Sequence, residues 1–163
     1  MNSSSDPIAI VLVALYRYQN FPIRILHALL EKIEGVEPHS IFFKNHYTNA
    51  VTPPTAKEES LFREKIAELQ PKLVGFSVYS PYVPIAQKLT NIVKEYSSAL
   101  VMWGGIHPTV SPESCLERSD IVCIGEGEGA LEDLAVALRD GKDYYSVNNL
   151  WIRQNGHLQQ NPL

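Results

Sequence analysis

The chain has 163 residues, of which 45% are hydrophobic and 20% are charged, and its formal net charge at pH 7 is −4. This length suits one domain with its own hydrophobic core, and the composition is that of an ordinary soluble globular protein. The absence of a strongly basic stretch argues against nucleic acid as a partner, and no apolar run approaches the roughly 18 residues expected of a membrane span.

The N-terminus and the cysteines bear on the cellular location. The first residues, MNSSSDP, lack the charged and apolar regions of a secretory signal, so we expect a cytoplasmic protein that does not associate with a membrane. The spacing of Cys115 and Cys123 matches no zinc-binding or redox motif. In a reducing compartment, both are expected to be small buried core residues.

Apolar runs rich in β-branched residues predict buried strands, and the stretches between them repeat their apolar residues with the 3.6-residue period of a helix. Thr55 and Glu58 have the spacing of a capping box at the start of the second helix. The expected strands span residues 8–15, 40–45, 73–80, 99–105 and 120–125. The expected helices span 22–34, 55–69, 84–97 and 129–140, with a further short helix from Ser111.

Strands that alternate with helices predict an α/β fold with a doubly wound parallel sheet and right-handed crossovers. We expect a five-stranded, flavodoxin-like sheet in the order 2-1-3-4-5, with helices on both faces. Residues 1–143 would form this Rossmann-like domain. In the remaining segment, 144–163, Asn155-Gly156 separates two short extended runs, which predicts a C-terminal hairpin or extension.

The carboxyl ends of the strands are where an open α/β sheet binds its ligands. The first loop there, 16–21, has neither the aspartates of a two-component receiver nor the Ser, Thr and Gly residues of a flavodoxin phosphate loop, and no P-loop motif occurs in the chain. Gly125-x-Gly127 resembles a dinucleotide fingerprint, but it follows the last strand instead of the first. Glu126 and Glu128 would also repel a pyrophosphate. These patterns argue against a nucleotide-binding site.

Catalytic groups are sparse at these loops. Of the five histidines, His107 alone lies on a loop that is expected to form the site, and no Ser or Cys stands in a pattern typical of a nucleophile. A histidine on a loop is more often a structural hydrogen-bonding group than a catalyst. The sequence therefore predicts no catalytic residue in this chain.

Glycines and hydroxyl groups concentrate at the same edge of the predicted sheet. Gly104-Gly105 ends a strand of bulky residues and has two readings, a tight turn with positive φ or the close approach of a large flat ligand. Ser77, Tyr79 and Ser80 end the neighbouring strand, where their hydroxyls would bond either local backbone groups or a ligand. The edge favours a broad pocket with little positive charge, which suits a large, amide-rich cofactor.

The segment GGIHPTVSPESCLERSDIVCIGEGEGALEDL, residues 104–134, closely resembles the cobalamin-binding domain at the N-terminus of class B radical S-adenosylmethionine enzymes. That family's segment reads roughly G-G-x-H-(P/A)-T, then P-E-x-x-L, then D-x-V-x-x-G-E-G-E, then x-L-x-x-L. The preceding segment, PKLVGFSVYSPYVPIAQKLTNIVKE, is similar to the family's third strand and helix. The resemblance is strong over residues 73–138 and covers the earlier residues only in the order of their elements.

The resemblance implies that a corrin ring lies over the carboxyl ends of the strands and that the nucleotide tail of cobalamin inserts beside strands three and four. Ser77, Tyr79 and Ser80 would line the tail pocket, and Gly104 and Gly105 would let the tail pass. Contacts with corrin amides or with the tail ribose are implied for His107, Thr109, Gly125, Glu126, Gly127 and Glu128.

The loop after the first strand departs from a related pattern. Many cobalamin domains carry Asp-x-His-x-x-Gly there, and the histidine coordinates cobalt, whereas this chain reads LYRYQNFPIR. The resemblance therefore implies base-off cobalamin without a histidine ligand, and no residue is assigned as a metal ligand. Tyr16, Arg17 or Tyr18 would cap the lower face of the corrin instead, and His46 is poorly placed after strand two.

In the family that this chain resembles, the module presents methylcobalamin or cob(I)alamin to a radical S-adenosylmethionine methyltransferase-type domain, which holds a [4Fe-4S] cluster and S-adenosylmethionine. The cluster motif CxxxCxxC does not occur in these 163 residues. We therefore expect this chain to be non-catalytic by itself and to act with such a domain of a parent chain. The competing hypothesis is a cofactor-free, flavodoxin-like interaction or sensor domain, which leaves the clustered glycines and glutamates unexplained.

Overall fold

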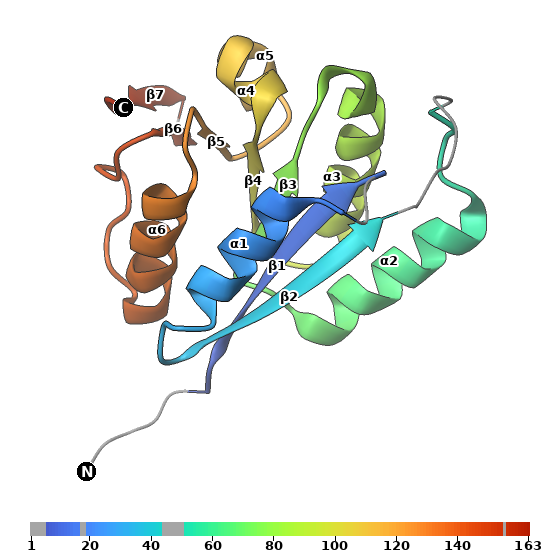
Figure 1. Cartoon of the computed structure of the whole chain (residues 1–163), viewed down its shortest axis with the longest axis horizontal. Coiled ribbons are helices and arrows are strands. Elements are labelled where there is room, and N and C mark those ends of the chain that lie inside the picture. The colour runs from blue at the N-terminus through green and yellow to red at the C-terminus, as the bar shows by residue number, and fades with distance from the viewer. Residues whose placement is uncertain (1–5, 17–18, 44–50, 155) are drawn as a thin grey trace.

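A computed structural model describes residues 6–16, 19–43, 51–154 and 156–163, and its centre is one twisted sheet (Figure 1). The strands lie in the order β2-β1-β3-β4-β5-β6-β7, so the predicted order 2-1-3-4-5 is confirmed and the predicted number of five strands is wrong. The strands are β1 (Ile8–Leu15), β2 (Val36–Phe43), β3 (Leu73–Ser77), β4 (Leu100–Gly104), β5 (Ile121–Cys123), β6 (Leu150–Gln154) and β7 (His157–Gln160).

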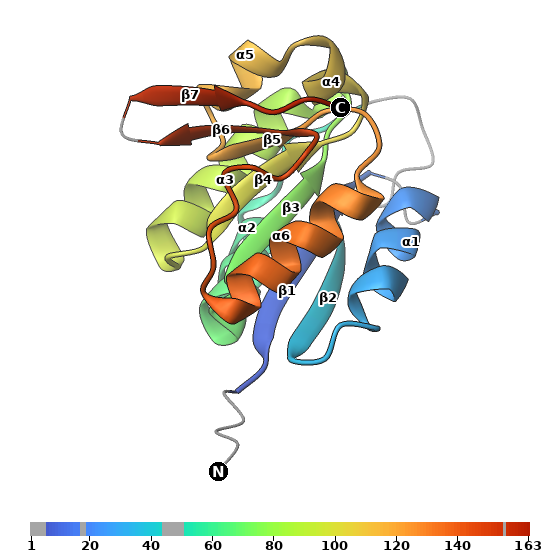
Figure 2. The same cartoon turned by 90° about the vertical axis from the view of Figure 1, so that its left-hand side faces the viewer.

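The two additional strands form the predicted C-terminal hairpin, but this hairpin continues the sheet. Strand β6 pairs antiparallel with β5, with Leu150 opposite Cys123, and β7 pairs antiparallel with β6. The segment that follows the last helix returns to the carboxyl edge before β6 begins (Figure 2). The chain therefore enters the sheet from that edge and can pair with β5 only in the antiparallel direction, which makes the sheet mixed.

Helices cover both faces of the sheet (Figures 1 and 2). Helices α1 (Phe21–Leu30) and α6 (Glu128–Asp140) lie on one face, and α2 (Ala56–Leu69) and α3 (Val83–Tyr96) lie on the other. Short helices follow the carboxyl ends of β3 and β4, namely η1 (Ser80–Tyr82), α4 (Ile106–Val110) and α5 (Pro112–Leu116). Within the described residues, no helix combines the length and the hydropathy needed to cross a membrane.

Strand β1 shows why its sequence is apolar without interruption. Ile10 and Leu12 pack towards α1 and α6, and Val11 and Val13 pack towards α2 and α3. All four side chains are at most 1% exposed. A parallel strand covered by helices on both faces buries both sets of alternating side chains, so neither set is polar.

Several element boundaries differ from the expected ones. Strand β2 begins at Val36, four residues before the start that its apolar run indicated. Its early part contains Pro38. Because β2 is an edge strand, a residue that lacks a backbone N–H is tolerated there. Strand β3 ends at Ser77 instead of residue 80, since the chain turns into η1. Helix α4 was not predicted, because it has five residues and contains Pro108.

Two local predictions are confirmed. The hydroxyl of Thr55 accepts a hydrogen bond from the backbone N–H of Glu58 at 3.3 Å, and the Glu58 carboxylate accepts one from the Thr55 N–H at 2.7 Å, which completes the capping box of α2. Cys115 and Cys123 are buried free thiols. They belong to the two separate core clusters on opposite faces of the sheet.

Candidate functional site

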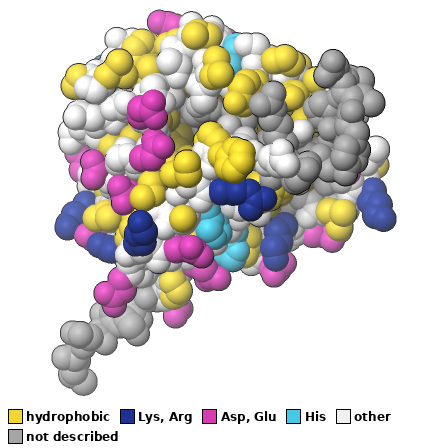
Figure 3. Space-filling model, viewed as in Figure 1, with side chains coloured by type: hydrophobic (Ala, Val, Ile, Leu, Met, Phe, Trp, Pro, Cys, Tyr) yellow, Lys and Arg dark blue, Asp and Glu magenta, His cyan; other side chains and the backbone are white. Residues whose placement is uncertain are grey.

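A cavity of about 400 Å³ opens at the carboxyl ends of the strands, on the face of the sheet that α1 and α6 cover. Hydrophobic side chains gather over the upper half of the surface in Figure 3, whereas most Lys and Arg side chains lie lower. The residues that line the cavity are Leu12, Pro22, Ile23, Ile25, Leu26, Gly75, Phe76, Ser77, Tyr79, Met102, Gly104, Gly105, Ile106, Thr109, Val110, Cys123, Gly125, Glu126, Gly127 and Glu128. Cations are lacking among these lining residues.

Small side chains of three strands make room for this cavity. Ser77 at the end of β3 is in register with Gly104 at the end of β4, and a Cβ built on Gly104 would lie 3.5 Å from the Cβ of Cys123 on β5. Two register positions deeper, Gly75 pairs with Met102. Because alternate residues of a strand point to opposite faces, these small residues all face α1 and α6. The cavity is therefore a consequence of register.

The two consecutive glycines differ in what they require. Gly105 has a φ of +107°, and a Cβ there would lie 3.2 Å from the backbone oxygen of Val78, so the fold itself demands glycine. Gly104 lies in β4, and a Cβ there would make only ordinary contact with Cys123. Of the two readings of this pair, the tight turn thus describes Gly105, whereas the close approach of a ligand at Gly104 stays a prediction.

The loop between β5 and α6 is fastened to α4 by a threonine. The N–H of Gly125 donates to the hydroxyl oxygen of Thr109 at 3.1 Å, and that hydroxyl donates to the carbonyl of Gly105 at 2.9 Å. Gly125 has a φ of +73°, which permits the turn. Glu126 and Glu128 line the cavity beyond this turn. The structure thereby brings together most of the predicted residues of this loop and of the β4–α4 loop.

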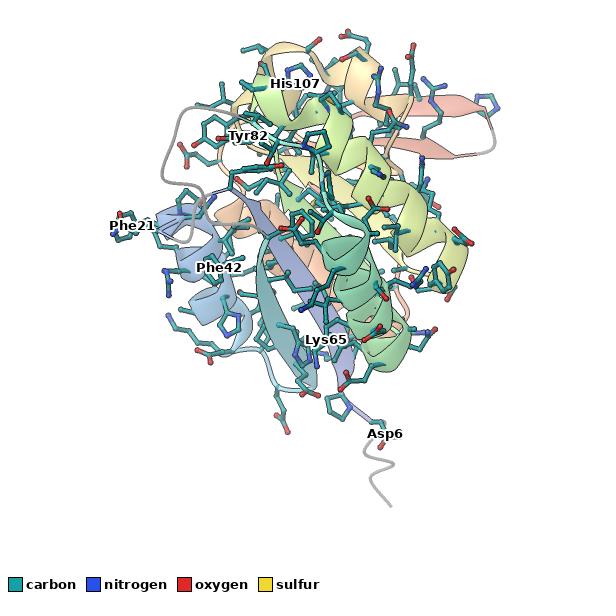
Figure 4. All side chains as sticks on the ribbon, turned by 90° about the vertical axis from the view of Figure 1, so that its right-hand side faces the viewer. Asp6, Phe21, Phe42, Lys65, Tyr82 and His107 are labelled. Carbon is teal, nitrogen blue, oxygen red and sulfur yellow. The ribbon has the colours of Figure 1, made fainter. Side chains whose placement is uncertain are left out.

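Two other predicted residues, Ser80 and His107, do not line the cavity. The hydroxyl of Ser80 is 3.0 Å from Nδ1 of His107, and the N–H of His107 donates to the carbonyl of Val78 at 3.2 Å. Figure 4 shows His107 and Tyr82 close to this end of the molecule. Tyr79, in contrast, lines the cavity together with Ser77. A ligand contact for Ser80 and His107 stays a prediction.

The first loop is represented by Tyr16, because Arg17, Tyr18 and His46 lie outside the described residues. Tyr16 is 2% exposed and stacks on Tyr82 with ring centroids 5.0 Å apart, and its hydroxyl donates to the carbonyl of Thr52. Burial raises the pKa of its phenol. The structure places Tyr16 in the core on the α2 and α3 face, and its contact with a corrin stays a prediction.

Sequence reasoning missed other residues of this region. Asn20 is buried and caps α1, since its Oδ1 accepts from the N–H of Ile23 at 3.1 Å, and its amide lies 3.5 Å from the hydroxyl of Ser77. An asparagine just before Phe21-Pro22 is a recognisable N-cap signal. Asn149 contacts the β5–α6 loop from a distant segment, and no local pattern announces it.

Cys123 contributes a neutral thiol to the floor of the cavity. Burial, and to a lesser degree the negative charge of Glu128, raises its pKa from an ordinary value of 9.0 to about 12. The thiolate, which is the form that binds metals and reacts with electrophiles, is therefore suppressed at neutral pH. The side chain acts as a small apolar wall.

The mouth of the cavity is rimmed by exposed apolar side chains. Ile25 of α1 and Ile106 and Val110 of α4 are 50%, 59% and 71% exposed. Phe21, at the start of α1, is 69% exposed and projects away from the body of the protein (Figure 4). Such a concentration of exposed apolar groups around one opening is typical of a surface that contacts a large ligand or another domain.

The fold and the cavity define an α/β domain with an opening at the carboxyl edge of its sheet, and the family is shown by the sequence. Residues 7–135, most of the chain, match the B12 binding domain. The chain belongs to this family. The resemblance to the cobalamin-binding domains of radical S-adenosylmethionine enzymes is thereby confirmed, and solved structures of such enzymes share the fold.

Two solved structures illustrate the shared fold. The cobalamin-dependent S-adenosylmethionine radical enzyme OxsB, with aqua-cobalamin and S-adenosylmethionine bound, superposes over 98% of this chain and 22% of its own chain, with a TM-score of 0.74 and 21% identity. The radical S-adenosylmethionine methyltransferase TsrM from Kitasatospora setae covers 94% of this chain and 30% of its own, with a TM-score of 0.77 and 21% identity.

Curated relatives are much longer than this chain. The anaerobic magnesium-protoporphyrin IX monomethyl ester cyclase of Cereibacter sphaeroides is 32% identical over 96 residues, which are 56% of this chain and 15% of the cyclase. The 4'-phospho-dehydrooxetanocin synthase of Priestia megaterium is 26% identical over 106 residues, which are 60% of this chain and 14% of the synthase. The aligned region thus spans about a seventh of these relatives.

Proposed function

We propose that this chain is a cobalamin-binding module that positions methylcobalamin or cob(I)alamin for a radical S-adenosylmethionine domain. The observation that carries the proposal is the cavity of about 400 Å³ at the carboxyl edge of the sheet. It lies within the range of roughly 300–1,000 Å³ typical of cofactor pockets. A cofactor-free sensor domain would leave this cavity without a purpose.

The lining of the cavity suits the nucleotide tail of cobalamin in its chemistry. Its wall is largely apolar, as a benzimidazole ring requires, and the hydroxyls of Ser77 and Tyr79 offer hydrogen bonds to a ribose or phosphate. Gly104 allows close approach to β4, since nothing projects from it into the cavity. Because the pKa of Cys123 is raised, its thiol stays protonated and carries no negative charge that would repel the tail phosphate.

The rim of the cavity fits the amide-bearing edge of a corrin. Corrin acetamide and propionamide groups donate N–H bonds, and the carboxylates of Glu126 and Glu128 accept them. Ile106 and Val110 provide apolar contact at the same opening. This arrangement accounts for acidic residues in a glycine loop that a pyrophosphate would avoid.

The proposal also concerns the group that lies against the lower face of the corrin. We assign base-off cobalamin without a histidine ligand, because the first loop contains no histidine in the sequence. Tyr16, Arg17 and Tyr18 remain the proposed lower-face group. As a test, His46→Ala should leave the visible spectrum of the bound cobalamin unchanged, and a changed spectrum would identify His46 as a ligand.

The chemistry belongs to the bound group and to the partner domain. Cobalamin supplies a transferable methyl group or a strongly nucleophilic cobalt(I) centre, and this chain supplies binding, orientation and shielding from water. A radical S-adenosylmethionine domain with its [4Fe-4S] cluster would cover the apolar rim and act on the substrate. The 163-residue chain alone is expected to show no turnover.

Titration with hydroxocobalamin tests the proposal. Binding should shift the visible absorption bands of the cofactor, and cobinamide, which lacks the nucleotide tail, should bind at least tenfold more weakly. An unchanged spectrum at saturating protein would overturn the cobalamin assignment. Equal affinities for the two corrinoids would instead show that the cavity does not hold the tail.

A further inference from the structure

We propose that Asn149 is a positioning residue of the cofactor site, so that the C-terminal extension completes a site whose other residues come from the B12 binding domain. Asn149 lies beyond residues 7–135, which match the family. This inference rests on the proposed function, because the loop that Asn149 holds, residues 124–127, lies at the mouth of the proposed cobalamin cavity.

Asn149 holds this loop through its backbone groups. The side-chain amide of Asn149 donates to the carbonyl of Ile124 at 2.9 Å and to the carbonyl of Glu126 at 3.3 Å. The backbone oxygen of Asn149 also accepts from the N–H of Ile124 at 2.9 Å. The amide nitrogen thus spans the turn at Gly125 and fixes both ends of it.

The conformation of Asn149 is itself constrained. Its φ is +65°, a left-handed value that asparagine adopts more readily than other residues with a side chain. Its backbone N–H donates to the carbonyl of Pro162 at 2.8 Å. An alanine at this position would lose the amide and would also strain the backbone, so glycine is the substitution that isolates the role of the amide.

The loop is held from its other side by Thr109, which bonds the N–H of Gly125. Asn149, just before β6, and Thr109, in α4, therefore hydrogen-bond the same turn from opposite sides. Glu126 and Gly127, which line the cavity, directly follow Gly125. A loop that is fixed before the ligand arrives loses less conformational entropy on binding, so these contacts should raise affinity for the cofactor.

Asn161 provides an internal contrast. It is 7% exposed, and its amide donates to the carbonyls of Tyr145, Val147 and Leu150 at 2.8 to 3.0 Å. These bonds fold the segment that carries Asn149, but none of them reaches the loop of residues 124–127. Loss of Asn161 should therefore lower the stability of the extension, whereas loss of the Asn149 amide should act on the loop.

The central experiment compares Asn149→Gly with Asn148→Gly, a change at the neighbouring exposed asparagine. Affinity for hydroxocobalamin should fall about tenfold in Asn149→Gly, which corresponds to the loss of one to two hydrogen bonds. Asn148→Gly should bind as the wild type does. Asn149→Asp keeps the shape but replaces the donor with an acceptor against two carbonyls, and it should lose at least as much affinity.

Hydrogen exchange without cobalamin supplies a readout that does not depend on binding. In Asn149→Gly, the amides of residues 124–127 should exchange at least fivefold faster, while protection of the β1 and β3 amides stays unchanged. The proposal is overturned if both Asn149 variants keep wild-type affinity, or if loop exchange does not change. If wild-type protein binds no cobalamin although loop exchange responds, the proposed function fails and Asn149 is a structural anchor only.

Discussion

The two faces of the sheet are built by alternate residues of the same strands, yet they differ in how completely they are filled. On the α2 and α3 face, the ends of β3 and β4 carry Phe76 and Trp103, which are at most 2% exposed. On the α1 and α6 face, the corresponding positions carry Ser77 and Gly104, and the cavity opens there.

This difference separates stability from binding within single strands. Large side chains on one face bury apolar area, which is the main favourable contribution to folding. Small side chains on the other face give up part of that burial and leave space for a ligand. Substitutions on the two faces should therefore move different measured quantities.

The largest effect is expected from Trp103→Ala on the filled face. Its ring is fully buried and its indole N–H donates to the hydroxyl of Thr90 at 3.0 Å, so the substitution creates a void and leaves a buried hydroxyl without its donor. The free energy of unfolding should fall by about 3–5 kcal/mol. Urea denaturation measures this change. Met102→Ala, on the cavity side of the same strand, is the control and should lower the free energy of unfolding by less. Equal losses would contradict the difference between the two faces of the sheet.

Gly104→Val should act on binding instead. A Cβ at this position makes only an ordinary contact with Cys123, so the fold should accept the side chain while the cavity becomes smaller. Affinity for hydroxocobalamin should fall at least tenfold, with a change in unfolding free energy below about 1 kcal/mol. Isothermal titration and denaturation measure the two quantities. Unimpaired binding would place the ligand elsewhere. Gly105→Val is a poor substitute for this test, because a valine at the φ of +107° that Gly105 adopts would strain the backbone.

A smaller effect is expected where Thr109 joins α4 to the loop between β5 and α6. Thr109→Val removes the hydroxyl that accepts from Gly125 and donates to Gly105, and affinity should fall about fivefold, in line with a net hydrogen-bond contribution of about 1 kcal/mol. Thr109→Ser retains the hydroxyl and should bind nearly as well as the wild type. If the two variants bind alike, the hydrogen bonds of the Thr109 hydroxyl do not contribute to cofactor affinity.

The effect that is smallest at neutral pH concerns the thiol in the cavity floor. Because the pKa of Cys123 is raised to about 12 in the folded chain from an ordinary value of 9.0, the unfolded chain ionises first as the pH rises. The unfolding free energy should therefore be insensitive to this group below about pH 9 and should decrease between about pH 9 and pH 12. Cys123→Ala should flatten this part of the stability profile; identical profiles would show that the thiol is not shielded.

The sequence predicted the sheet well where single strands have an unambiguous pattern. The uninterrupted apolar run of β1 and the alternation of strands with helices were sufficient for the order 2-1-3-4-5. Strand β2 was placed too late, because its early half contains Pro38 and polar residues that only an edge position tolerates. The pairing of β6 with β5 was also missed, since the direction from which a chain reaches an edge is not a local property.

The candidate site divides in the same way. Glycines, hydroxyls and glutamates at the strand ends are visible in the sequence, because parallel strands bring their carboxyl ends to one edge. Side-chain volume at each register position, the different demands of Gly104 and Gly105, and the burial of Tyr16 depend on neighbours that are distant in the chain. Local periodicity therefore determined the fold class and the edge that carries the site, whereas the register between strands and the return of Asn149 to that edge were decided only by tertiary packing.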